Sequence, residues 1–243
     1  MSELDLVVER GAIHGLIGPN GSGKTTTVNL VTGFLQADDG EVWLAGERVP
    51  EPKPHTLARL GVGRVFQRAE VFAGVSASEN VLGGFHLVAN RNLFANVLTL
   101  PSARRRDREL RTEAEGLLSA LGLAELTDVH ASALPFGDRR LLEVARAMAA
   151  RPTLLILDEP ATGLSAVELT RLAALLRRLR DAGVTVLLIE HNMEFLMGLW
   201  DRVTVLDYGS KIFEGTPDQV QRDPRVVEAY LGAHAGSSIE VEQ

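Results

Sequence analysis

The segment GPNGSGKTT, residues 18–26, constrains the fold of this chain more than any other feature. It follows a predicted strand and opens a predicted helix, which is the context that the pattern G-x-x-x-x-G-K-[ST] requires. Its glycines let backbone N–H groups converge on phosphates, and the helix N-terminus adds a positive dipole. We therefore predict a phosphate loop in which Lys24 contacts the β- and γ-phosphates and Thr25 binds Mg²⁺. The phosphate loop consists of Gly18, Pro19, Asn20, Gly21, Ser22, Gly23, Lys24, Thr25 and Thr26.

Short apolar runs alternate with longer helical patterns along the chain, which is typical of a parallel α/β sheet. Two other runs are bracketed by glycine and are predicted as antiparallel strands at the margin of that sheet. The parallel strands are expected at 12–18, 64–66, 153–158, 184–190 and 202–207, and the marginal strands at 40–49 and 209–215.

The middle of the chain has no strand pattern and is predicted to be a helical subdomain. Helices are expected near 76–89, 107–121 and 138–150, with the basic cluster 103–108 in a loop between the first two. These arginines are interpreted as a solvated helix start or as a contact with anionic lipid or a partner. The predicted organisation is one domain over 1–243, with its core and β margin in 1–67 and 152–232, the helical subdomain in 68–151 and a polar tail in 233–243.

Composition narrows the class of protein. The net charge of −7 argues against a generally basic surface for nucleic acid, so no nucleic-acid partner is expected. The lack of cysteine excludes disulfides, thiol nucleophiles and Cys-ligated metals. No apolar run is long enough to span a bilayer and the N-terminus has no signal-peptide pattern, so we expect a cytoplasmic protein that reaches a membrane only through another subunit.

A second polar cluster is expected where predicted strands end. The run LLILDEP ends in Asp158 and Glu159, at the carboxyl edge of the sheet. Asp158 would hold Mg²⁺ and Glu159 would polarise the attacking water, which are the groups that phosphoryl transfer needs beside a phosphate loop. Gln67 and His191 also close predicted strands, and we expect their side chains at the same edge.

Taken in order, the phosphate loop, Gln67, LPFGD, LLILDEP, ATGLS and His191 resemble the nucleotide-binding domain of ABC transporters. The resemblance runs from Leu4 to Gly232. It implies phosphate and metal roles for Lys24 and Thr25, metal binding and permease sensing for Gln67, and hydrolytic roles for Asp158, Glu159 and His191. It also implies that a signature segment binds the γ-phosphate of ATP held by a partner subunit. That signature segment consists of Leu134, Pro135, Phe136, Gly137 and Asp138.

Finer features resemble one subgroup. The stretch RVFQRAEVFAGVSASENVLGG, the basic insert, IEHNMEFLMGLWDRVTVLDYGSKIFEGTP and the closing VVEAYLG look like ATPases of branched-chain amino acid importers. Urea importers and lipopolysaccharide exporters have related ATPases and remain alternatives. Two others are a soluble ABC ATPase without a permease and a P-loop kinase, although a kinase leaves Gln67, Gly137 and His191 unexplained.

The chain departs from the family pattern at three places. Pro135 stands where the family has a Ser whose hydroxyl donates to the γ-phosphate, so the signature segment must bind through backbone N–H groups and the helix terminus. No aromatic residue precedes Gly18 to stack on adenine, and such stacking is worth about 1–3 kcal/mol in nucleic-acid complexes. Ser165 stands where Asp or Asn is usual, which questions communication between the two sites of a dimer.

Together these features predict an α/β P-loop NTPase with a mostly parallel sheet core, a marginal antiparallel β subdomain and a helical signature subdomain. The expected function is ATP binding and hydrolysis, with ATP and Mg²⁺, in an ABC transporter that imports branched-chain or related amino acids. The expected partners are a second ABC ATPase subunit, in a homodimer or heterodimer, and an integral membrane permease. The expected location is peripheral, on the cytoplasmic face of the cell membrane.

Overall fold

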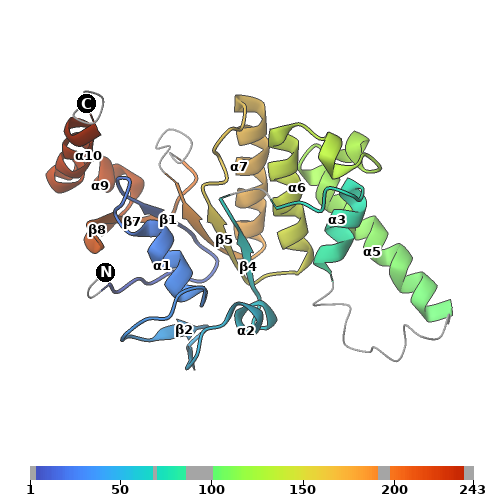
Figure 1. The fold of residues 1–243 in the computed structure, drawn as a ribbon, viewed down its shortest axis with the longest axis horizontal. Coiled ribbons are helices and arrows are strands. Elements are labelled where there is room, and N and C mark those ends of the chain that lie inside the picture. The colour runs from blue at the N-terminus through green and yellow to red at the C-terminus, as the bar shows by residue number, and fades with distance from the viewer. Residues whose placement is uncertain (1–3, 68–69, 86–100, 191–197, 238–243) are drawn as a thin grey trace. The chain divides into compact units, whose positions relative to one another are not determined.

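The computed structural model describes residues 4–67, 70–85, 101–190 and 198–237 (Figure 1). The chain divides into two compact units. Unit 1 contains Met1–Leu57 and Arg180–Gln243, and unit 2 contains Ala58–Leu179. The fold is a mostly parallel α/β sheet protein with a small antiparallel sheet, as the sequence predicted.

The core of unit 1 is a four-strand arrangement around β1. Strand β1 pairs in parallel with β6 on one side and β7 on the other, and β8 pairs antiparallel with β7. All five residues of β1 are buried, which is typical of a parallel strand covered on both faces. Gly15 is required in β1, because a Cβ there would lie 2.6 Å from the Trp200 indole. The strands are β1 (Ile13–Ile17), β6 (Thr185–Ile189), β7 (Arg202–Asp207) and β8 (Ser210–Gly215).

The rest of unit 1 consists of helices and a short hairpin. Helix α1 begins directly after the phosphate loop, and strands β2 and β3 form the separate antiparallel sheet. Helix α9 begins with a capping box in which Thr216 and Gln219 bond each other's backbone N–H groups. The elements are α1 (Lys24–Val31), β2 (Val42–Leu44), β3 (Glu47–Val49), α9 (Pro217–Arg222) and α10 (Pro224–Ser237), and α2 (Pro54–Arg59) crosses into unit 2.

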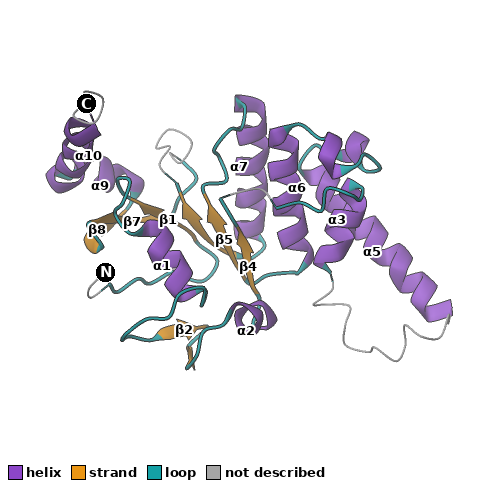
Figure 2. Cartoon of the chain, viewed as in Figure 1, coloured by secondary structure: helices purple, strands orange, loops and turns teal. Residues whose placement is uncertain are grey.

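Unit 2 combines a parallel strand pair with packed helices. Strand β4 pairs in parallel with β5. Helices α3, α5 and α6 contact one another and are drawn in purple in Figure 2. Helix α3 approaches α6 so closely that a Cβ on Gly84 would lie 2.2 Å from the Arg146 carbonyl oxygen. The elements are β4 (Val62–Val65), α3 (Ala77–Gly84), α5 (Pro101–Ala120), α6 (Phe136–Ala149) and β5 (Leu154–Asp158), with 3₁₀ turns at Ala124–Leu126 and Ala131–Ala133, and α7 (Ala166–Asp181) ends in the first residues of the second segment of unit 1.

Several element bounds differ from those predicted. The basic cluster 103–108 was predicted in a loop and lies inside α5, because Arg is a good helix former and Pro suits the first helical position. Strand β4 lies at 62–65 rather than 64–66. Its pairing with β5 already begins at Gly61, because the Gly61 carbonyl oxygen accepts the backbone N–H groups of Thr153 and Leu154 at the start of β5. Helix α10 continues through 233–237, where a tail was expected. Among the helices described, none has both the length and the apolar character to cross a membrane.

Candidate active site

The phosphate loop connects the end of β1 to the start of α1 and depends on its glycines. Gly18 has φ +152° and a Cβ there would lie 2.1 Å from the Leu206 carbonyl oxygen, so the loop passes directly against the end of β7. Gly21 and Gly23 have φ +78° and +101°, a region that favours glycine. The loop is also tied to the β7–β8 turn, where Gly209 N–H donates to the Ser22 carbonyl oxygen at 2.9 Å. Its backbone path is therefore fixed against the end of β7 and the β7–β8 turn.

Lys24 is held inside this loop. Only 7% of the residue is exposed, and Nζ donates to the carbonyl oxygens of Gly18 at 2.7 Å and Pro19 at 2.8 Å. Thr25 and Thr26 are exposed on the first turn of α1, while the Thr27 hydroxyl is turned inward to the Gly23 carbonyl. No side chain caps α1 and its first turn carries no acidic residue. The first turn of α1 thus presents two exposed hydroxyls and no carboxylate of its own, with the Lys24 ammonium inside the adjoining loop, which suits a phosphate group.

Asp158 and Glu159 stand where the sequence places them, at the end of β5. Asp158 is 3% exposed, and its Oδ2 lies 3.5 Å from the Arg64 guanidinium. Burial raises the pKa of Asp158, and the neighbouring Glu159 charge adds to this while Arg64 opposes it. Glu159 has φ +49°, a left-handed conformation that is uncommon for a residue with a Cβ. The buried aspartate and the strained glutamate have the features of a functional strand end.

Gln67 lies beside Glu159, at the sheet edge where its side chain was expected. Its side-chain Nε2 donates to Glu159 Oε2 at 2.9 Å, although the two residues lie far apart in the sequence. Strands β4 and β5 are neighbours and end at the same edge, which explains the meeting. His191, the other residue expected there, lies outside the described residues. The geometry therefore pairs the amide of Gln67 with the carboxylate of Glu159.

The signature segment leads into the first turn of α6. Pro135 is the N-cap residue and provides no side-chain cap, while Phe136 is 49% exposed. Gly137 lies so close to Glu168 that a Cβ would be 2.0 Å from its Oε1. Glu168 Oε2 in turn accepts the Ser165 N–H at 2.6 Å, so Ser165 and Glu168 form a capping box that starts α7. Ser165 therefore has a structural role as the N-cap of α7, a role that Asp or Asn can also fill.

Two arginines make contacts at this edge that sequence reasoning did not predict, although Arg140 was noted as a charge near the signature segment. Arg64 reaches Asp158 and stacks on Phe66, with 4.6 Å from its Cζ to the ring centroid. Arg140 donates to the carbonyl oxygens of Asp158 and Glu159 from inside α6. The one sequence signal was a charged pair, Arg140 and Glu143, three residues apart among the apolar positions of a predicted helix.

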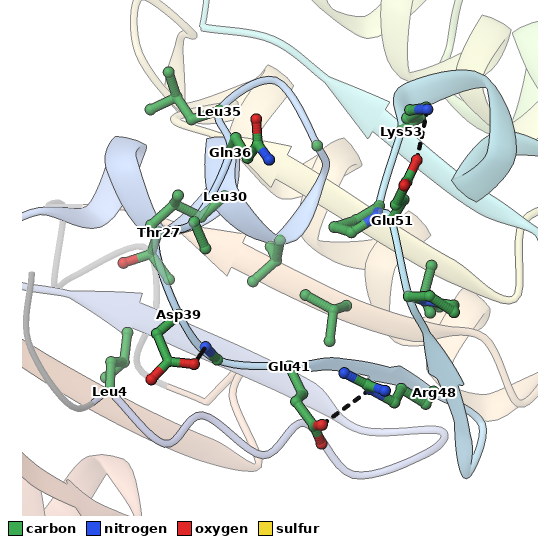
Figure 3. Close-up of a pocket in the computed structure, with 18 residues that line it drawn as sticks. Leu4, Thr27, Leu30, Leu35, Gln36, Asp39, Glu41, Arg48, Glu51 and Lys53 are labelled. Atoms are coloured by element: carbon green, nitrogen blue, oxygen red, sulfur yellow. Dashed lines mark hydrogen bonds and ion pairs between the residues drawn. The ribbon is translucent and has the colours of Figure 1, made fainter.

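Unit 1 also contains a cavity of about 570 Å³ beside α1 and the β2–β3 hairpin (Figure 3). Thr27 and Leu30 of α1 line it, opposite the segment that leads to Lys53. Ion pairs join Glu41 to Arg48 at 2.9 Å and Glu51 to Lys53 at 2.7 Å. Its lining residues include no aromatic side chain, so this cavity does not replace the aromatic residue that is absent before Gly18.

Comparison with known proteins agrees with this geometry. The family model described as ABC transporter matches residues 1–162, and the model described as Branched-chain amino acid ATP-binding cassette transporter matches residues 210–236. The chain is 41% identical over 230 residues to the high-affinity branched-chain amino acid transport ATP-binding protein BraF of Pseudomonas aeruginosa, covering 94% of this chain and 90% of that protein. It is also 41% identical over 221 residues to LivG of Escherichia coli, covering 90% and 87%.

Solved structures give the same result. A nucleotide-free ATP-binding cassette from an ABC transporter superposes with a TM-score of 0.78 at 30% identity, covering 93% of this chain and 90% of that one. An ATP-binding cassette of an ABC transporter in its ADP conformation superposes with a TM-score of 0.77, also at 30% identity, covering 93% and 89%.

Proposed function

This chain belongs to the ABC transporter family, and from this premise we propose that it is the ATP-hydrolysing subunit of an importer for branched-chain amino acids. The observation that carries the proposal is the phosphate loop, with a buried Lys24 and an uncapped helix terminus. In the structure the ammonium group is bonded to the loop's own carbonyl oxygens, and we infer that it turns to the β- and γ-phosphates of ATP.

Glu159 is the proposed general base for the attacking water. Its Oε2 is already bonded to the Gln67 amide, which orients the carboxylate and makes Gln67 a group through which a docked partner can alter hydrolysis. His191 is proposed as a further catalytic residue from the family resemblance. These roles account for a left-handed glutamate at the strand end, because its strain is retained where geometry matters for the reaction.

Thr25, Gln67 and Asp158 are the proposed ligands of Mg²⁺. A hydroxyl, an amide oxygen and a carboxylate are hard oxygen donors, which is the ligand chemistry that Mg²⁺ prefers. Bound Mg²⁺ would neutralise charge on the phosphates. A metal ion would also favour the ionised form of Asp158, whose pKa is raised by burial in the protein alone.

The signature segment is proposed to bind the γ-phosphate of ATP held by a second subunit, either another copy or a related chain. Pro135 offers neither a hydroxyl nor an N–H, so the backbone N–H groups of the first turn of α6 must make this contact. Each ATP would then lie between the phosphate loop of one subunit and Leu134–Asp138 of the other. ATP would close the dimer and hydrolysis would open it.

We propose that this cycle drives a separate integral membrane permease, with the chain bound peripherally on the cytoplasmic face. The cargo is proposed from the relatives, since an ATPase subunit need not touch it. Vesicles that contain the chain, its permease and its binding protein should take up labelled leucine when ATP is supplied. Uptake of urea instead, export of lipopolysaccharide, or recovery of the chain with ribosomes or DNA would favour the corresponding alternative.

Phosphate release from ATP tests the enzymatic part directly. Glu159→Gln should lower the turnover number by about 100-fold or more, as expected for loss of a general base, while ATP binding is kept and an ATP-dependent dimer accumulates. Glu125→Gln, on an exposed 3₁₀ turn, is the matched control and should behave as wild type. Wild-type rates in Glu159→Gln, together with no dimer in ATP, would contradict the proposal.

A further inference from the structure

Arg140 is the most deeply buried charged residue among the described residues of unit 2. It is 1% exposed on α6 and donates three hydrogen bonds to backbone carbonyls outside its own helix. One goes to Phe66, directly before Gln67. The other two go to Asp158 at 2.9 Å and Glu159 at 2.8 Å. One guanidinium thus connects the segment after β4 to the two peptide units at the end of β5.

Glu143 completes the arrangement one turn further along α6. It is 2% exposed, and its Oε2 lies 3.3 Å from Arg140 Nη1. Its Oε1 accepts the backbone N–H of Glu70 at 3.5 Å. The Arg140–Glu143 pair therefore contacts the backbone of Phe66, directly before Gln67, and of Glu70, and also the backbone on which Glu159 stands. All of these residues belong to unit 2.

Stability alone is a poor reason for such a pair. Two buried charges lose their hydration, and replacing a buried ion pair with apolar side chains of similar volume is often neutral or stabilising. The backbone that Arg140 holds is unusual, because Glu159 has a left-handed φ of +49° and its carbonyl is bonded to the guanidinium. The fork of Arg fixes several carbonyls at defined angles, which apolar packing cannot do.

We propose that the Arg140–Glu143 pair is a positioning device, which orients Glu159 and Gln67 for hydrolysis and couples them to the signature segment. This inference rests on the proposed function, since it assigns the pair a role in that same ATP site. Arg140 lies one helical turn after Phe136, so a shift of the first turn of α6 moves the guanidinium with it. Contact between the signature segment and a partner's ATP would thereby reach the general base through one rigid helix.

Steady-state ATP hydrolysis by the full chain tests the proposal with four variants. Arg140→Met should lower kcat by about 10- to 100-fold, because a displacement of about 1 Å can cost about 100-fold, while KM for ATP stays unchanged. Arg140→Lys should recover part of kcat. Arg151→Met is the matched control, because it breaks an exposed Arg–Glu pair with Glu113 at 2.6 Å in the same unit.

The double variant Arg140→Met/Glu143→Leu separates positioning from stability. It removes both charges and should return the thermal midpoint toward wild type, whereas kcat stays low. Recovery of kcat together with stability would show a structural role and overturn the proposal. Should both Met variants fail to fold, Arg140→Lys decides: a kcat within about twofold of wild type overturns the proposal, and a loss of about tenfold with unchanged KM supports it.

A second cycle asks whether Arg140 acts through Glu159. In a Glu159→Gln background, Arg140→Met should cause little further loss of the residual single-turnover rate, because the group that it positions is already gone. Additive losses would overturn the proposal. Failure of the proposed function is distinct, since wild type would then release no phosphate at all, and the positioning role would fall with it.

Discussion

Gly18→Ala should destabilise the protein considerably more than Gly21→Ala, although both glycines belong to the phosphate loop. At Gly21 a Cβ meets nothing within 4 Å, so only its φ of +78° opposes the substitution. At Gly18 the φ of +152° is also unfavourable, and the Cβ would lie 2.1 Å from the Leu206 carbonyl oxygen and 2.6 Å from Ser22 Oγ. The Leu206 oxygen is a backbone atom, so it can move only if strand β7 moves.

The magnitudes follow from these contacts. Gly21→Ala should cost about 1–2 kcal/mol of unfolding free energy for the left-handed backbone, less the gain of about 0.4–1 kcal/mol from a stiffer unfolded chain. Gly18→Ala should itself cost about 1–3 kcal/mol of unfolding free energy for backbone strain, and a further amount of about 1–3 kcal/mol for overpacking against β7. The difference should therefore be about 2 kcal/mol or more, or roughly 4–8 °C in the thermal midpoint of a chain of this size.

Thermal unfolding of the two variants and wild type, without nucleotide, measures this difference. Gly40→Ala is a third reference, because its Cβ would also be in open space with φ +107°. Equal losses in Gly18→Ala and Gly21→Ala would refute the close contact between the phosphate loop and β7. Preserved stability in Gly18→Ala would do so more strongly.

Three further predictions concern other contacts. Burial lowers the pKa of His14, so the unfolded chain takes up its proton near pH 6.5 and the folded chain only at lower pH. Stability is therefore full above that value and lost as pH falls through the window down to the folded pKa. In urea unfolding, His14→Gln should flatten this loss, and an unchanged pH slope would contradict the assignment. Thr216→Ala should cost about 1 kcal/mol by removing the cap of α9, and a loss near zero would contradict that cap. Ser165→Ala should cost a similar amount by removing its bond to the Glu168 N–H, with a fully retained thermal midpoint as the contrary result.

The sequence predicted the elements whose signals are local. The phosphate loop and the strand that ends in Asp158 each carry their pattern within a few residues. The run 40–49, predicted as a strand at the margin of the main sheet, instead forms the two strands β2 and β3 of a separate antiparallel sheet. Gln67 was expected at the edge where the strands end, and its Nε2 lies 2.9 Å from Glu159 Oε2, a direct contact that was not itself predicted.

Other features could not be predicted because their causes are distant in the sequence. Arg140 donates to the Phe66 carbonyl oxygen, 74 residues away, and no pattern in the sequence of α6 indicates that contact. The start of α5 was misplaced because a run of arginines is compatible with a loop or a helix, and the Arg105–Glu109 pair at 2.9 Å appears only once the helix is formed. The role of Ser165 as a cap likewise depends on where Glu168 points.

The central claim is that each ATP site needs the phosphate loop of one subunit and the signature segment of another. Lys24→Ala should inactivate the phosphate loop. Gly137→Asp places a carboxylate at the first turn of α6 and should inactivate the signature segment. Each variant alone should be inactive. Mixed in equal amounts, they should regain up to about a quarter of wild-type phosphate release, since about half of randomly paired dimers contain one intact site of two. No recovery from mixtures that still form dimers would contradict the claim.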